Sequence, residues 1–155
     1  MKKFIFGSLA FSLLTLNAMA YNVDKAKEFK SFYSHMTQKA CADSKLFMKA
    51  DELMKMLRDK KEFFMLDVRT DGENAVLSLS GKNSLHIPIN VLFEKENLNK
   101  LSMDKPIVVV CHSGTRATLA AIGLKQLGFK KIHVLKGGMV ALAKANNPKN
   151  APISK

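Results

Sequence analysis

One cysteine in this sequence stands where a thiol can become a reactive anion. Cys111 follows the apolar run 106–110 (PIVVV), which is short, β-branched and typical of a strand buried on both faces. Apolar side chains then recur at helical spacing until Gly128, a typical helix C-cap: Ala117, Ala120, Ala121, Leu124 and Leu127. Cys111 therefore lies where a strand passes into a helix, and the free N–H groups and the helix dipole favour an anion there.

The residues after Cys111 suit a nucleophile. A free thiol is only about 3% thiolate at neutral pH, and we expect the helix N-terminus and the guanidinium of Arg116 to raise that fraction. Gly114 tolerates a positive φ and lets backbone N–H groups point inward around the sulfur. The alternative is a structural cysteine buried at a strand end. The local pattern favours an activated nucleophile in an anion-binding loop.

Three blocks of this sequence resemble the single-domain rhodanese family of sulfurtransferases. They are 65–69 (MLDVR), 86–88 (HIP), and 110–116 (VCHSGTR) with 135–138 (LKGG) beyond. The resemblance covers roughly residues 46–145. It implies an α/β fold, a three-layer α/β/α sandwich with a mainly parallel central sheet, and the strands that alternate with helices along the chain agree with this.

The resemblance also implies a reaction. Cys111 would be catalytic, attacking the outer sulfur of an anionic donor (thiosulfate-like or polysulfide) to form a persulfide. A thiol, sulfite or cyanide would accept the sulfur, and a protein is a further candidate acceptor. The substrate-binding residues would be those of the loop: His112, Ser113, Gly114, Thr115 and Arg116. We expect the side chain of His112 to point outward.

Asp67 and Arg69 have two interpretations. In the resembled family they lie near the active-site loop and help to hold it, which makes them supporting residues. The alternative is that they only pair with each other or cap the following turn. His86 is expected to be a structural histidine with its hydrogen bonds satisfied, and His133 a structural or edge residue of a strand.

Two other functions use the same residues. A thiosulfate sulfurtransferase-like enzyme is favoured, but a periplasmic persulfide carrier or sulfur-sensing module with little turnover is the alternative. A phosphatase of similar fold would have Cys-x5-Arg, whereas this chain has the shorter Cys-x4-Arg. The shorter loop suits one sulfur atom better than a tetrahedral phosphate.

The chain divides into four predicted segments. Residues 1–20 have the basic start, short apolar run and Ala-Met-Ala end of a secretory signal peptide cut after Ala20. Residues 21–45 form a helical extension, with one helix over 21–42 that Asp24 caps and that packs on the outside of the domain; a dimerising or partner-binding helix is the alternative. Residues 46–145 form the rhodanese-like domain, and 146–155 a polar tail. We expect a periplasmic protein with no stable membrane anchor after cleavage.

Within the domain, the apolar patterns predict strands at 46–48, 63–67, 106–110 and 131–135. Helices are expected at 50–59 and from 138 to about 144, with a short, interrupted one within 91–101. Residues 70–83 are rich in turn-forming pairs and are expected to be turns.

Charge and cysteine content restrict the partners. The formal net charge of +12 falls to +10 without the two lysines of segment 1–20. The basic residues are not interleaved with aromatic ones, so no nucleic acid is expected. No cofactor fingerprint or metal-ligand spacing is present, and neither cofactor nor metal is predicted. Cys41 is expected to be a lone thiol near the end of the first helix; pairing with Cys111 in a reversible disulfide is the alternative.

Overall fold

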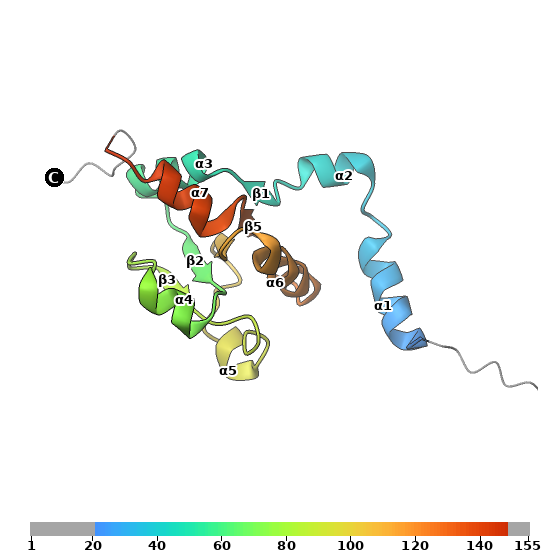
Figure 1. The fold of residues 1–155 in the computed structure, drawn as a ribbon. Helices are drawn as coiled ribbons and strands as arrows, with labels where there is room; N and C mark the ends of the chain where they lie inside the picture. Colours follow the sequence, from blue (N-terminus) through green and yellow to red (C-terminus); the bar gives the residue numbers. More distant parts are fainter. Residues whose placement is uncertain (1–20, 149–155) are drawn as a thin grey trace, which may run out of the picture. The chain divides into compact units, whose positions relative to one another are not determined.

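The computed structural model describes residues 21–148, and its centre is a parallel sheet. The five strands lie in the order β1-β5-β4-β2-β3 (Figure 1). They are β1 (Phe47–Met48), β2 (Phe64–Asp67), β3 (Ser84–His86), β4 (Ile107–Val110) and β5 (Ile132–Leu135). The helices are α1 (Val23–Tyr33), α2 (Gln38–Asp43), α3 (Ala50–Arg58), α4 (Asp71–Val76), α5 (Lys95–Leu98), α6 (Thr115–Gln126) and α7 (Gly138–Ala145).

Strand β4 forms the centre of the core, as its β-branched sequence predicts. All four of its residues are buried. Val109 packs in one apolar cluster with residues of α6, while Val108 and Val110 pack in a second cluster with residues of α3 and α7. Alternate side chains of a strand point to opposite faces, so helices cover both faces of the sheet. The predicted three-layer α/β/α sandwich is therefore confirmed, and the sheet is parallel throughout.

Helix α6 follows the predicted pattern except at its end. Ala117, Ala120, Ala121 and Leu124 are buried, and Gly128 has the left-handed conformation expected after a helix (φ +94°). Leu127 was predicted to lie on the apolar face but is 52% exposed. It is the C-cap of α6, where the helical period no longer applies.

The register of β2 and β4 brings two loops together. Asp67 pairs with Val110 across the two strands, and the N–H of Val68 donates to the carbonyl of Val110 over 2.9 Å. The segments that follow these two strands therefore leave the sheet side by side, at its carboxyl edge. Ligands of open α/β sheets bind at this edge.

The predicted single helix over 21–42 is wrong, because the structure has two helices there. Thr37 begins α2 by accepting a hydrogen bond on its hydroxyl from the N–H of Ala40 (3.1 Å), which is an N-cap. Cys41 lies in this second helix and not near the end of the first. The cap of α1 is the side chain of Asn22, not that of Asp24.

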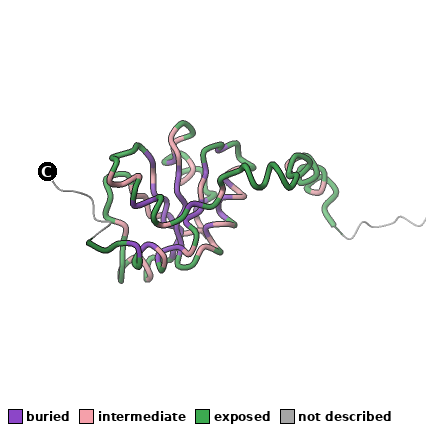
Figure 2. The backbone as a smooth tube through the Cα atoms, turned by 90° about the horizontal axis from the view of Figure 1, so that it is seen from above, coloured by how far each residue is buried: buried purple, intermediate pink, exposed green. Residues whose placement is uncertain are grey.

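The described residues up to Met36 form a unit separate from the residues that begin at Thr37. Helix α1 in this unit has no buried residue (Figure 2). The expected packing of this helix against the domain stays a prediction.

The segment 70–83 contains a helix that the turn pattern does not predict. Thr70 and Glu73 begin α4 with a capping box. The N–H of Glu73 donates to the Thr70 hydroxyl (3.3 Å), and the N–H of Thr70 donates to the Glu73 carboxylate (3.1 Å). Helix α4 has only six residues and includes Gly72, so its helical period is weak while its turn-forming residues are conspicuous.

Both ends of the chain lie outside the described residues. The predicted signal peptide (1–20) and residues 149–155 of the predicted tail belong to these ends. Within residues 21–148, no helix has the length and apolar character needed to cross a membrane.

Candidate active site

The sulfur of Cys111 lies in a loop between β4 and α6. Its side chain is 1% exposed, and the backbone N–H of Gly114 donates to Sγ over 3.0 Å. Gly114 has φ +114°, a conformation that L side chains rarely adopt. This glycine therefore lets the chain turn back so that its own N–H faces the sulfur.

Helix α7 is tied to the Cys111 loop by two backbone hydrogen bonds. The N–H of Met139 donates to the carbonyl of Cys111 (2.8 Å), and the N–H of Val140 donates to the carbonyl of His112 (3.2 Å). A trans peptide places its N–H opposite its C=O, so the N–H groups of His112 and Ser113 point away from α7. Gly138 permits this contact, because a Cβ there would collide with the Cys111 carbonyl oxygen and lie 2.6 Å from the His112 carbonyl carbon.

Helix α6 begins directly after the loop and presents its positive end there. Gly114 is its N-cap and has no side chain to satisfy the first N–H groups, which leaves them available to an anion. The hydroxyl of Thr118 donates to the Gly114 carbonyl over 3.0 Å and fixes the start of the helix. His112, Ser113 and Thr115 are exposed on the rim of the loop.

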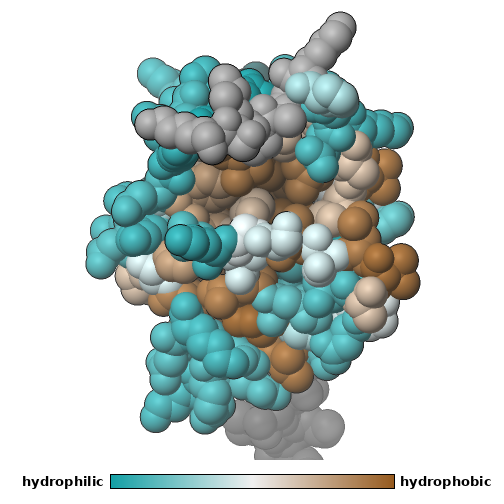
Figure 3. Space-filling model, turned by 90° about the vertical axis from the view of Figure 1, so that its left-hand side faces the viewer, coloured by the Kyte–Doolittle hydropathy of each residue, from teal (hydrophilic) through white to brown (hydrophobic). Residues whose placement is uncertain are grey.

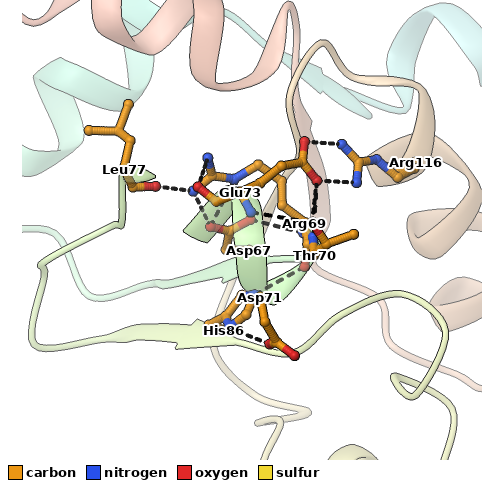
Figure 4. A network of polar contacts seen from close by, with 8 residues as sticks. All are labelled: Asp67, Arg69, Thr70, Asp71, Glu73, Leu77, His86 and Arg116. Carbon is orange, nitrogen blue, oxygen red and sulfur yellow. Dashed lines mark hydrogen bonds and ion pairs between the residues drawn. The ribbon is translucent and has the colours of Figure 1, made fainter. Parts of the chain in front are cut away.

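Arg116 does not lie free beside the loop, because a carboxylate binds it. Its Nη1 and Nη2 donate to the two oxygens of Glu73, each over 2.6 Å (Figure 4). These hydrogen bonds, with that from the Thr70 N–H, hold the pKa of the Glu73 carboxyl well below its usual range. The same pairing raises the pKa of Arg116, and the charge of Cys111 adds to this effect to a smaller extent.

Asp67 and Arg69 form a second, buried ion pair. Arg69 Nε and Nη2 donate to Asp67 Oδ1 and Oδ2 over 2.9 and 2.6 Å, and both residues are nearly inaccessible to solvent. Nη2 also donates to the carbonyl of Leu77 (2.5 Å), and Nη1 to that of Glu73 (3.4 Å). The pair thus ties the end of β2 to α4 and the residue after it. The pairing of the two residues with each other is therefore present, and their role in holding the Cys111 loop stays a prediction.

Two histidines of the strands, one at this edge and one near the opposite edge, have backbone partners. His86 Nε2 lies 3.0 Å from the carbonyl oxygen of Arg69, and His133 Nδ1 lies 2.8 Å from that of Lys45. A ring nitrogen that donates to a carbonyl fixes the orientation of the ring. Both histidines therefore hold loops in place, and neither donates to the sulfur of Cys111.

Both cysteines are free thiols, Cys41 exposed and Cys111 buried. Across the part of the chain that the structure describes, no group of three His, Cys, Asp or Glu side chains could hold a metal ion.

A cavity of about 400 Å³ opens beside the loop. Most of its lining is apolar, and its polar members come from the two ion pairs and the loop. The lining residues are Val76, Leu77, Met139, Val140 and Ala143, with Arg69, Glu73 and His112.

A second cavity, of about 380 Å³, shares Leu77, Met139 and Ala143 with the first. It also extends over Met54 and Met65. Figure 3 shows hydrophobic side chains gathered in a hollow on one face of the molecule and bordered by hydrophilic ones. The surroundings of the loop therefore combine a sulfur-binding backbone with apolar walls.

This arrangement can carry out nucleophilic chemistry at sulfur. A thiol that accepts a backbone N–H bond at a helix N-terminus is positioned to act as an anion. Residues 49–145 match the rhodanese-like domain family. The chain belongs to this family.

Relatives and solved structures agree with the assignment. A sulfurtransferase from Allochromatium vinosum is 27% identical over 103 residues, which are 66% of this chain and 92% of the relative. The crystal structure of a rhodanese-related protein from Thermoplasma volcanium superposes with a TM-score of 0.55 and 33% identity, covering 65% of this chain and 93% of that protein. A rhodanese-like domain protein from Staphylococcus aureus gives a TM-score of 0.53 and 27% identity over 70% and 98% of the two chains.

The structure adds two residues that the sequence prediction missed. Glu73 binds the arginine of the loop, and Gly138 allows α7 to reach the loop backbone. Glu73 was visible as the last residue of a Thr-x-x-Glu capping box at 70–73. Gly138 was recognised only as the start of a helix, since its contact with residues 111 and 112 depends on the tertiary fold.

Proposed function

We propose that the protein is a sulfurtransferase that carries sulfane sulfur as a persulfide on Cys111. The observation that carries this proposal is the Gly114 N–H aimed at Sγ over 3.0 Å, in a loop that two backbone hydrogen bonds tie to α7. A donor fixed in this direction stabilises negative charge on sulfur without reorganisation. The sulfurtransferase name of the Allochromatium relative supports sulfur transfer in general.

The first half-reaction is a displacement at sulfur. The electron pair of the Cys111 thiolate attacks the outer sulfur of a thiosulfate-like or polysulfide donor, and a new S–S bond forms. The S–S bond within the donor breaks, and the leaving group (sulfite, from thiosulfate) departs with the electron pair. Charge is conserved, and the product is an anionic Cys111 persulfide. The loop N–H groups of residues 112–116 hold this charge.

The second half-reaction regenerates the thiolate. An acceptor thiolate, sulfite or cyanide attacks the outer sulfur of the persulfide and forms a bond to it. The S–S bond of the persulfide breaks, and its electron pair returns to Cys111. No external oxidant or reductant is required, and neither a metal nor a cofactor takes part in the proposed cycle.

A persulfide carrier or sensor is the second candidate, and one observation favours it. Cys111 is only 1% exposed, which protects a bound sulfur and restricts small acceptors. In this case transfer would be slow with small thiols and fast with a partner protein.

We further propose a periplasmic location after cleavage behind Ala20, which N-terminal sequencing of the exported protein would test.

Intact-mass measurement on the reduced protein, before and after thiosulfate or polysulfide, tests the proposal. The expected result is a gain of one sulfur atom that cyanide removes and that Cys111→Ser abolishes. Cys41→Ser is the matched control, because it removes the exposed thiol and should leave the gain unchanged. A gain that depends on Cys41, or no gain from any donor, would contradict the proposal.

A further inference from the structure

We propose that Glu73 is a specificity-determining residue. By neutralising Arg116, it makes the site prefer sulfur donors of low negative charge that carry an apolar group over the compact thiosulfate dianion. This inference rests on the proposed function and narrows its donor class. The sequence pattern predicts that Arg116 binds an anionic donor, but in the structure a carboxylate already binds the guanidinium.

The contact between Glu73 and Arg116 occupies both partners. Two parallel N–H···O bonds of 2.6 Å are the bidentate geometry that binds a carboxylate most strongly. Glu73 is itself held by the N–H and the hydroxyl of Thr70 (3.1 and 3.0 Å). The carboxylate is therefore a fixed partner, and an incoming anion would have to displace it to reach the guanidinium.

The electrostatic effect of Arg116 extends to the nucleophile. The charge of Cys111 contributes to the raised pKa of Arg116, after the larger effect of Glu73. Arg116 is the second residue of α6, which begins directly after the Cys111 loop. With Glu73 ionised, the pair adds a positive and a negative charge whose fields at the sulfur largely cancel.

The cavity beside the loop provides the second observation. Five of its eight lining residues are apolar. The two residues of its lining that are charged at neutral pH are each in an ion pair, Arg69 with Asp67 and Glu73 with Arg116. A small inorganic dianion finds no unpaired guanidinium there. The apolar walls suit the carbon part of an organic persulfide or polysulfide.

Glu73→Gln tests the role of the charge while keeping the helix cap. Glutamine occupies the third position of a capping box as glutamate does, so α4 should remain. The matched control is Glu52→Gln in α3, where an exposed glutamate accepts a hydrogen bond from the N–H of Lys49 (3.1 Å) in the same capping position. All variants carry Cys41→Ser so that only Cys111 reacts.

The readout is the alkylation rate of Cys111 by iodoacetate relative to iodoacetamide. In both reactions the thiolate forms a C–S bond and iodide leaves with the C–I electron pair, and the two reagents differ chiefly in charge. Glu73→Gln removes the negative charge that neutralises Arg116 and should raise the ratio about three- to tenfold, as expected for one charge acting over a short distance in a partly solvated site. Glu52→Gln should leave the ratio unchanged.

The reverse substitution completes the cycle. Arg116→Gln leaves the Glu73 carboxylate unpaired and should lower the ratio below that of the parent protein. The double variant Glu73→Gln/Arg116→Gln should return close to the parent value, because both charges are gone. If Glu73→Gln fails to fold, judged by circular dichroism, Arg116→Gln alone still decides, since an unchanged ratio there would overturn the proposal.

The two proposals can fail separately. Alkylation requires no sulfur transfer, so the ratio reports on Glu73 even if Cys111 never takes up sulfur from a donor. If transfer occurs, Glu73→Gln should lower KM for thiosulfate several-fold. A ratio and a KM that do not move in a folded Glu73→Gln variant would show that the ion pair has only a structural role.

Discussion

The two arginines near Cys111 are used differently although each pairs with a carboxylate. The Arg69 pair with Asp67 is buried and close in sequence, and its remaining N–H groups reach backbone carbonyls. The Arg116 pair with Glu73 is about one-third exposed and joins residues 43 positions apart. The first pair ties the end of β2 to α4 and Leu77, and the second places a carboxylate on the arginine that follows the Cys111 loop.

The Glu73 pair predicts a dependence of stability on pH. The folded-state pKa of Glu73 lies below its ordinary value of 4.5, so the ionised carboxylate stabilises the folded state at pH values above 4.5. This stabilisation is lost as the pH falls through the lower pKa of the folded state. Urea unfolding should therefore show parent protein more stable than Glu73→Gln at neutral pH, with the difference shrinking towards pH of about 3.

A constant difference across this range would show that the carboxylate charge does not stabilise the fold. Glu52→Gln serves as the control here too, because Glu52 caps its helix from an exposed position through the N–H of Lys49 and not through an arginine. The stability difference between parent protein and Glu52→Gln should stay nearly constant over this pH range.

Between elements, the contact of α7 with the Cys111 loop determines the shape of the site. The two hydrogen bonds from Met139 and Val140 reach the loop only because residue 138 lacks a side chain. The central strand supplies the cysteine and α6 supplies the positive helix end, but the last helix sets the direction of the loop peptides.

Replacing Gly138 by alanine should therefore remove reactivity. The new Cβ would collide with the backbone of residues 111 and 112, and the φ of +55° is unfavourable for alanine. We expect a loss of about 1–3 kcal/mol in the free energy of unfolding and a fall in the alkylation rate of Cys111 of at least tenfold.

Gly72→Ala is the matched control, since a Cβ there meets no atom within 4 Å. Alanine in α4 should raise the free energy of unfolding by roughly 0.5–1 kcal/mol. If Cys111 were alkylated as fast in Gly138→Ala as in Gly72→Ala, the hydrogen bonds from α7 to the loop would not be needed for the reactivity of the thiol.

At the scale of the molecule, the sequence predicted what depends on local pattern. The β-branched run before Cys111 and the alanine stripe after it placed the strand, the loop and α6, and Gly114 indicated a left-handed turn. The local sequence pattern did not predict contacts that join distant segments. Glu73 meets Arg116 only because β2 and β4 are neighbours in register, and the six-residue helix that presents Glu73 is too short to show a period.

The division of the chain predicts the effect of removing its first unit. Helix α1 has no buried residue, while both apolar clusters lie between Leu46 and Ala145. A protein of residues 37–155 should therefore have the same free energy of unfolding in urea as one of residues 21–155, within about 0.5 kcal/mol. The two proteins should also take up sulfur equally well. A less stable or inactive short form would assign a structural role to α1.

The contact of α7 with the loop also has a consequence for the order in which the site is completed during synthesis. A ribosome makes the cysteine well before it makes Gly138, and the loop receives its two hydrogen bonds from α7. Chains that stop short of this helix carry the thiol without the backbone that orients it. The loop around Cys111 is thus completed only after α7 has been made, and fragments that end before Gly138 lack the two hydrogen bonds that orient the loop peptides.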